Sequence, residues 1–68
     1  MKQSRPIRIL LVEDSRADAL LTRKALQKAR ILNDVDVVRD GEEALDYLFR
    51  RGAHADAPIP DLVLLDLN

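Results

Sequence analysis

The sequence contains no cysteine and no tryptophan, and it has one tyrosine, one phenylalanine and one histidine among its 68 residues. The absence of cysteine excludes disulfide bonds, thiolate zinc sites and thiol nucleophiles, and it fits a reducing compartment. The scarcity of aromatic side chains argues against a platform on which nucleic-acid bases stack. It also predicts a core made mainly of aliphatic side chains.

Neither sign of charge dominates, and no apolar run is long. Eleven Lys and Arg against twelve Asp and Glu give a net charge of −1, which lacks the basic field that nucleic-acid binding needs. The apolar runs are too short for a membrane span or a signal peptide. We therefore expect a cytoplasmic chain, one domain at most, with neither nucleic acid nor a membrane as a partner.

Alternating periodicities predict the order strand, helix, strand, helix, strand. The predicted strands cover residues 7–12, 35–38 and 61–66, and the predicted helices cover residues 16–30 and 41–51. The last strand contains an unbroken apolar run, which is typical of a strand buried on both faces of a parallel sheet. The order predicts an α/β fold, the β-α-β-α-β half of a doubly wound parallel sheet, without fixing which strand is central.

Polar residues mark where both helices begin. Ser15 is the expected N-cap of the first helix, and Asp40 of the second, with Glu43 completing a capping box. Gly52 is the expected stop of the second helix.

Each helix also carries an apolar pattern. On the first helix, small and apolar residues recur every fourth position and share a face: Ala17, Leu21, Ala25 and Ala29. On the second helix we expect Phe49 in the core and Tyr47 at the surface.

Three carboxylates are expected to meet at one edge of the sheet. Glu13 and Asp14 follow the first strand directly, and Asp66 ends the last one. Acids this close are stable only when protonated or when they share a cation, and a hard dication suits them best. Mg²⁺ would also neutralise charge if a carboxylate attacked phosphorus. A solvated turn and helix cap is the simpler interpretation of the Glu13–Asp14 pair taken alone.

Three segments in this order resemble the receiver domain of two-component response regulators. They are Ile-Leu-Leu-Val-Glu-Asp-Ser at 9–15, Arg-Asp-Gly-Glu-Glu-Ala-Leu at 39–45, and Pro-Asp-Leu-Val-Leu-Leu-Asp-Leu-Asn at 60–68. The resemblance covers nearly the whole chain and implies the amino-terminal half of a flavodoxin-like fold. The loop over 52–60 and the Asp-Leu-Asn ending are similar to the single-domain regulators of bacterial phytochrome-type histidine kinases.

The resemblance implies a role for each acid. Asp66 would be the phosphoacceptor, Asp14 would bind Mg²⁺ directly, and Glu13 would help through water. Asn68 would add its backbone carbonyl to the metal shell. The phosphoryl donor would be a sensor histidine kinase or a histidine phosphotransfer protein, so the chain would be a signalling phosphoacceptor and not an enzyme.

The sequence departs from the family in its length, because a whole receiver is close to twice as long. The family's switch hydroxyl, phosphate-binding lysine and mobile aromatic have no counterpart here. Because the lysine and the hydroxyl stabilise the phosphoryl oxygens, we expect this chain to bind Mg²⁺ weakly and to phosphorylate poorly.

Two other functions compete with this interpretation. The apolar edge of strand 61–66 invites pairing with another chain, so a non-catalytic, self-assembling receiver fragment is the alternative. A phosphohydrolase is disfavoured, because such enzymes usually have a second acid two residues after the nucleophile, where this chain has Asn68. His54 lies in a polar loop without a metal-ligand spacing, and we expect it to be structural or neutral.

Overall fold

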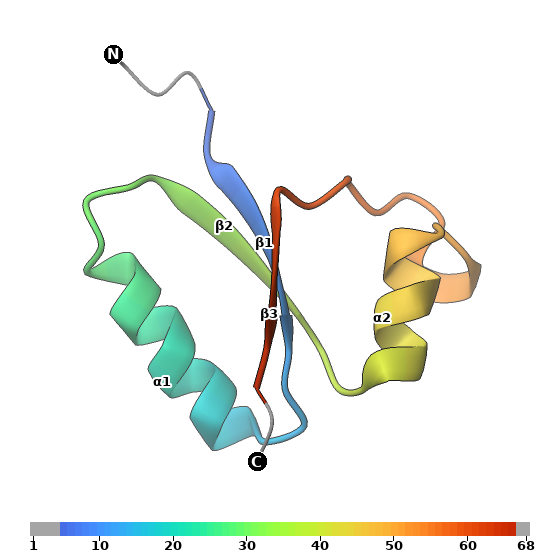
Figure 1. Ribbon diagram of the computed structural model, residues 1–68, viewed down its shortest axis with the longest axis horizontal. Helices are drawn as coiled ribbons and strands as arrows, with labels where there is room; N and C mark the ends of the chain where they lie inside the picture. Colours follow the sequence, from blue (N-terminus) through green and yellow to red (C-terminus); the bar gives the residue numbers. More distant parts are fainter. Residues whose placement is uncertain (1–4, 67–68) are drawn as a thin grey trace.

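The computed structural model describes residues 5–66, which form a three-stranded parallel sheet with one helix on each side (Figure 1). The elements follow one another as β1 (Ile7–Val12), α1 (Arg16–Gln27), β2 (Asn33–Val38), α2 (Gly41–Leu48), the short 3-10 helix η1 (Gly52–His54) and β3 (Leu62–Leu65). The strand order is β2-β1-β3, so the first strand is central. The expected half of a doubly wound α/β sheet is thus confirmed.

This strand order explains why the helices cover opposite faces. The chain crosses from β1 to β2 through α1, and then returns across β1 to β3 through α2. With right-handed connections, two crossings in opposite directions place their helices on opposite sides of the sheet, as Figure 1 shows. No helix within residues 5–66 is both long and apolar enough to cross a membrane.

The register brings the carboxyl ends of β1 and β3 together. Val12, the last residue of β1, pairs with Val38 of β2 and with Leu65 of β3. Just beyond the strands, the Glu13 N–H donates to the Val38 carbonyl at 2.8 Å, and the Asp66 N–H donates to the Val12 carbonyl at 3.2 Å. Backbone hydrogen bonds therefore fix both acids at one edge of the sheet.

Within residues 5–66, the central strand supplies three of the seven buried hydrophobic residues, Ile9, Leu10 and Leu11. Leu10 and Leu11 are 0% and 1% exposed, and successive side chains of a strand point to opposite faces. Leu10 packs with a cluster on the α2 side of the sheet: Val38, Ala44 and Tyr47. Leu11 faces the side on which α1 lies, where the buried residue of that helix is Ala19.

The first helix ends earlier, and the second strand begins earlier, than the sequence pattern predicts. α1 stops at Gln27 and not at residue 30. Beyond it, the side-chain amide of Asn33 donates to the carbonyls of Leu26 at 3.0 Å and Ile31 at 2.9 Å. Asn33 therefore satisfies a carbonyl at the end of the helix and also opens β2, where the expected start was residue 35.

The second helix ends at Leu48 and not at residue 51, and Gly52 is not its stop. Arg50 has a positive φ of 56°. The Arg50 N–H donates to the Tyr47 carbonyl at 3.3 Å, and the Arg51 N–H donates to the Asp46 carbonyl at 2.8 Å. These two bonds make a Schellman ending in which an arginine takes the left-handed position that usually favours glycine.

The last strand covers Leu62–Leu65, which is one residue shorter at each end than the predicted range of 61–66. Asp61 precedes the strand. Its carboxylate accepts two hydrogen bonds from Arg5, both at 2.8 Å, and one from the Arg8 N–H at 2.8 Å. These bonds hold the pKa of Asp61 far below its usual range, the Arg5 hydrogen bond contributing most. Asp61 thus ties the start of β3 to β1, at the end of the sheet away from Asp66.

The expected faces of both helices are wrong in part. The residues repeated every fourth position on α1 are exposed: Ala17, Leu21, Ala25 and Ala29. Because an α-helix has 3.6 residues per turn, residues four apart lie at progressively different angles around the helix axis, so they do not form one face against the sheet. On α2, Tyr47 is buried and Phe49 is exposed, which reverses the prediction.

A hydrogen bond explains the burial of Tyr47. Its hydroxyl donates to Oδ2 of Asp36 at 2.6 Å, so the ring can enter the core without leaving a polar group unsatisfied. Phe49 lies at the end of α2, where the Arg51 guanidinium carbon is 5.3 Å from the centre of its ring.

Alkaline pH is expected to destabilise the fold through Tyr47. Burial first, and then the hydrogen bond to Asp36, raise the pKa of Tyr47 from 10.0 to about 12. The fold therefore favours the neutral phenol, and this contribution of about 2–3 kcal/mol is complete below pH 10 and is lost as the pH rises towards 12. Ultraviolet absorbance measures the titration directly, since Tyr47 is the only tyrosine in the sequence. An ordinary pKa for Tyr47 in the folded chain would contradict this expectation.

Candidate functional site

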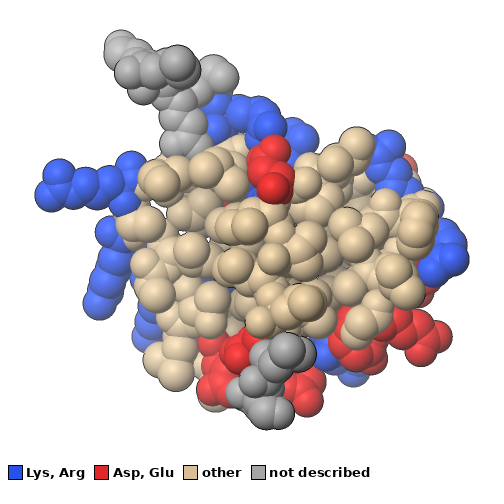
Figure 2. All heavy atoms as spheres, viewed as in Figure 1, with Lys and Arg blue, Asp and Glu red and all other residues tan. Residues whose placement is uncertain are grey.

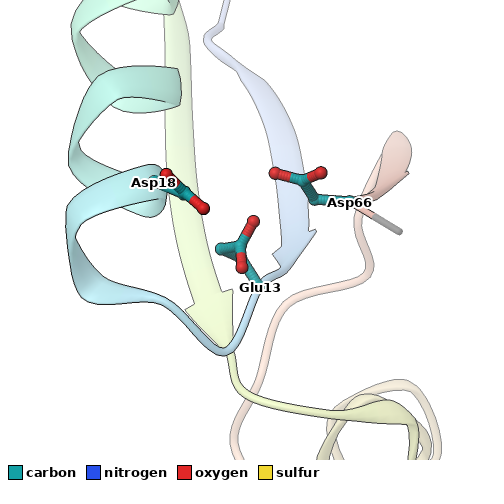
Figure 3. Close-up of side chains that lie close together, drawn as sticks. All are labelled: Glu13, Asp18 and Asp66. Carbon is teal, nitrogen blue, oxygen red and sulfur yellow. The ribbon is translucent and has the colours of Figure 1, made fainter. Parts of the chain in front are cut away.

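Three carboxylates from three different elements meet at the carboxyl edge of the sheet (Figure 3). Glu13 follows β1, Asp18 lies in the first turn of α1, and Asp66 follows β3. One carboxylate oxygen of each lies within 4.8 Å of those of the other two. Figure 2 shows acidic side chains gathered at this end of the molecule.

Glu13 is the most deeply buried member of this carboxylate cluster, at 3% exposed. Its Oε2 accepts a hydrogen bond from the Ser15 N–H at 3.0 Å. Its Oε1 is buried and has no hydrogen-bond partner within residues 5–66. A buried carboxylate oxygen without a partner is unfavourable unless a donor or a cation satisfies it.

Asp18 was not among the site residues predicted from the sequence. Its backbone N–H donates to Oγ of Ser15 at 3.2 Å, which confirms Ser15 as the N-cap. Its half-buried side chain turns towards Glu13 and Asp66. The available signal was position, because α1 begins so soon after β1 that its first turn returns over the end of the strand.

Asp14 is not part of the cluster. It is exposed and lines an open cavity of about 680 Å³ together with Glu13 and three arginines: Arg16, Arg23 and Arg39. The predicted Glu13–Asp14 pair therefore differs in exposure: Glu13 is buried in the carboxylate cluster, whereas Asp14 is exposed beside the arginines of a cavity that both residues line. Asn68 lies outside the described residues.

The carboxylate cluster is electrostatically unfavourable by itself. Two like charges 4 Å apart repel by about 1 kcal/mol in water and by about 4 kcal/mol near a protein surface. An acid in the first turn of a helix gains only about 0.3–1 kcal/mol from the helix dipole. The repulsion that Asp18 experiences from the other two carboxylates therefore exceeds the stabilisation that it gains from the helix dipole, unless the three acids share a positive charge.

The cluster fits a divalent cation. Hard cations prefer oxygen ligands, and two oxygens on opposite sides of an ion lie about 4.0–4.2 Å apart around Mg²⁺ and about 4.6–5.2 Å apart around Ca²⁺. The separations in the cluster, at most 4.8 Å, are within or close to these ranges. The unsatisfied Oε1 of Glu13 is a free ligand atom for such an ion.

His54 and Glu43 serve the scaffold and not this site. Nε2 of His54 lies 3.0 Å from Oε2 of Glu43, and Oε1 of Glu43 accepts the Arg39 N–H at 2.9 Å. The Arg39 N–H first, and then His54, lower the pKa of Glu43. These contacts hold the η1 loop and the start of α2 together, which agrees with the structural role expected of His54.

Comparison with known proteins finds response regulators both among similar sequences and among similar solved structures. No protein-family profile matches the chain. Response regulator Rcp1 of Synechocystis sp. is 43% identical over 60 residues, which make up 88% of this chain and 41% of Rcp1. The phosphorylated cyanobacterial phytochrome response regulator RcpA is 47% identical with a TM-score of 0.82, over 94% of this chain and 46% of RcpA. The Mn²⁺-bound form of Rcp1 is 43% identical with a TM-score of 0.83, over 93% of this chain and 45% of Rcp1.

The chain thus spans less than half the length of these relatives. Across that span, both the sequence identity and the superposition are high, and the strand order agrees with the expected half of a doubly wound sheet. We conclude that the chain is homologous to response regulators over the part of them that it spans, and that residues 5–66 have the receiver fold over that part.

Proposed function

We propose that this chain is a phosphoacceptor of two-component signalling, in which Asp66 takes a phosphoryl group from a histidine kinase or a histidine phosphotransfer protein. The observation that carries the proposal is the position of Asp66 beside Glu13, whose buried Oε1 lacks a partner within residues 5–66. The similar protein RcpA has been solved in a phosphorylated form. With a donor of this kind, we propose a cytoplasmic location for the chain.

Asp66 is the reacting group. It is exposed, so a donor phosphohistidine can approach one of its carboxylate oxygens. The new bond forms between that oxygen and phosphorus as the bond between phosphorus and the histidine nitrogen breaks, and the histidine keeps the electron pair. The chain itself is the acceptor, so it is a signalling domain and not an enzyme acting on another substrate.

The other residues of the site would balance the negative charge of the phosphoryl group and of its donor. Mg²⁺ would neutralise the transferring group and align it when held by Glu13 and Asp66, with Asp14 and the backbone carbonyl of Asn68 as the further ligands that the family resemblance implies. On the neighbouring wall, the arginines that line the cavity beside Asp14 would attract an anionic donor.

Substitution of Asp66 tests the proposal. With Mg²⁺ and acetyl phosphate, we expect a minor fraction of wild-type chains to carry an acid-stable, base-labile phosphoryl group, and Asp66→Asn to carry none. The yield is expected to be low because no lysine among the described residues lines the cavity beside Glu13. Intact mass spectrometry measures the fraction, with Asp34→Asn as a charge-matched control at the other end of the sheet.

Two outcomes would count against these statements. Equal phosphorylation of Asp66→Asn and wild type would show that Asp66 is not the acceptor. Stoichiometric phosphorylation of the wild type would show that the chain is not impaired.

Self-assembly without phosphotransfer is a second candidate function, favoured by the exposure of β3. Leu62, Val63 and Leu65 are 47%, 39% and 64% exposed, and within the described sheet β3 pairs on one side only. Figure 2 shows a largely uncharged surface on this side. An exposed apolar edge strand favours pairing with another chain. Light scattering would exclude this candidate if the chain remains a monomer at high concentration.

A further inference from the structure

We infer that Asp18 is a direct ligand of the divalent cation, and that it makes the site favour larger cations than Mg²⁺. This inference rests on the cation site of the proposed function. It adds a ligand supplied by a helix to ligands supplied by the ends of two strands.

The first support is the unsatisfied oxygen at the centre of the cluster. Glu13 is 3% exposed, and its Oε1 has no hydrogen-bond partner in residues 5–66. Figure 3 shows the Glu13 carboxylate between those of Asp18 and Asp66. A cation bound among the three carboxylates would therefore have ligand oxygens from both Glu13 and Asp18 within reach.

The second support is that helix capping does not account for the direction of the Asp18 side chain. The cap uses the Asp18 backbone N–H and the Ser15 hydroxyl. An acid at this position would interact favourably with the helix dipole from solvent as well. Its carboxylate instead lies within 4.8 Å of two other carboxylates, one of them buried, which is favourable only when the three acids share a cation or a proton.

Selectivity follows from ligand number and spacing. Mg²⁺ is usually held by one or two carboxylates and keeps several waters, whereas Ca²⁺ takes six to eight oxygens at longer distances. Oxygens within 4.8 Å of one another accommodate either ion, so the third carboxylate favours Ca²⁺ through the number of oxygen ligands that it adds. Loss of Asp18 should therefore weaken Ca²⁺ binding more than Mg²⁺ binding.

Isothermal titration calorimetry with Ca²⁺ and with Mg²⁺, on the whole chain, tests this inference. For Asp18→Asn we expect Ca²⁺ affinity to fall about tenfold or more and Mg²⁺ affinity to fall about threefold or less. Asp34→Asn controls for the change in net charge. Ser15→Ala is the matched structural control, since it weakens the same helix start without removing a carboxylate.

Three other outcomes would contradict this inference. Equal losses for both ions in Asp18→Asn, reproduced by Ser15→Ala, would show that Asp18 acts only through the helix, and the inference would be wrong. Unchanged affinities in Asp18→Asn, with losses in Asp66→Asn, would reject Asp18 as a ligand and leave the proposed function intact. A wild-type chain that binds neither ion would overturn the proposed cation site as well.

Discussion

Leu10→Ala is expected to leave most of the chain unfolded in dilute buffer. Leu10 is 0% exposed, lies on the central strand, and packs against β2 and α2. Truncation of a buried leucine costs about 2–5 kcal/mol. The core of a chain this small supplies only about 3–5 kcal/mol of net stability. The loss is therefore comparable to the whole free energy of unfolding, and far-ultraviolet circular dichroism across a urea titration measures it.

Leu21→Ala is the matched control for this prediction. The substitution is chemically the same, but Leu21 is 65% exposed on α1, so the free energy of unfolding should change by no more than about 0.5 kcal/mol. Equal losses in the two variants would mean that the hydrophobic core does not lie around β1.

The order of elements was predictable because each strand and helix has its own local pattern. The run from Leu62 to Leu65 and the β-branched residues of β2 favour strands, whatever lies beside them. The central place of β1 is different. It depends on contacts between segments far apart in the chain, such as Val12 with both Val38 and Leu65, and no local pattern reports such contacts.

Side-chain orientation was the least predictable feature of the helices. Tyr47 and Phe49 are two positions apart, and apolar character alone favours Phe49 as the core residue. The deciding factor is Asp36 on β2, which accepts the Tyr47 hydroxyl and makes burial of the tyrosine favourable. A partner 11 residues away in the sequence therefore reverses the expected pattern.

The carboxylate cluster was predictable from the sequence only in part. Glu13 and Asp66 could be predicted together, because each follows a strand of a parallel sheet. Asp18 had only its position soon after the strand as a signal, because a first-turn acid is adequately explained by the helix alone. Its functional interest arises only from its distance to the other two carboxylates.

Glu13→Gln is expected to stabilise the chain when no divalent cation is present. The wild-type side chain buries a carboxylate whose Oε1 has no partner within residues 5–66. Glutamine keeps an oxygen that accepts the Ser15 N–H, and its amide can donate towards the carboxylates of Asp18 and Asp66. Removing an unsatisfied buried group and its repulsion should raise the free energy of unfolding by about 1–3 kcal/mol.

A divalent cation should reverse this advantage. A ligand present at 100 times its dissociation constant stabilises the folded state by about 2.7 kcal/mol, and this gain requires the Glu13 carboxylate. Urea unfolding of both forms, with a chelator and then with saturating Mn²⁺, measures the difference. Glu42→Gln, an exposed first-turn position of α2, is the matched control. If Glu13→Gln gained as much from the cation as the wild type, Glu13 would be a structural residue; a gain confined to the wild type would mean that the site sacrifices stability for cation binding.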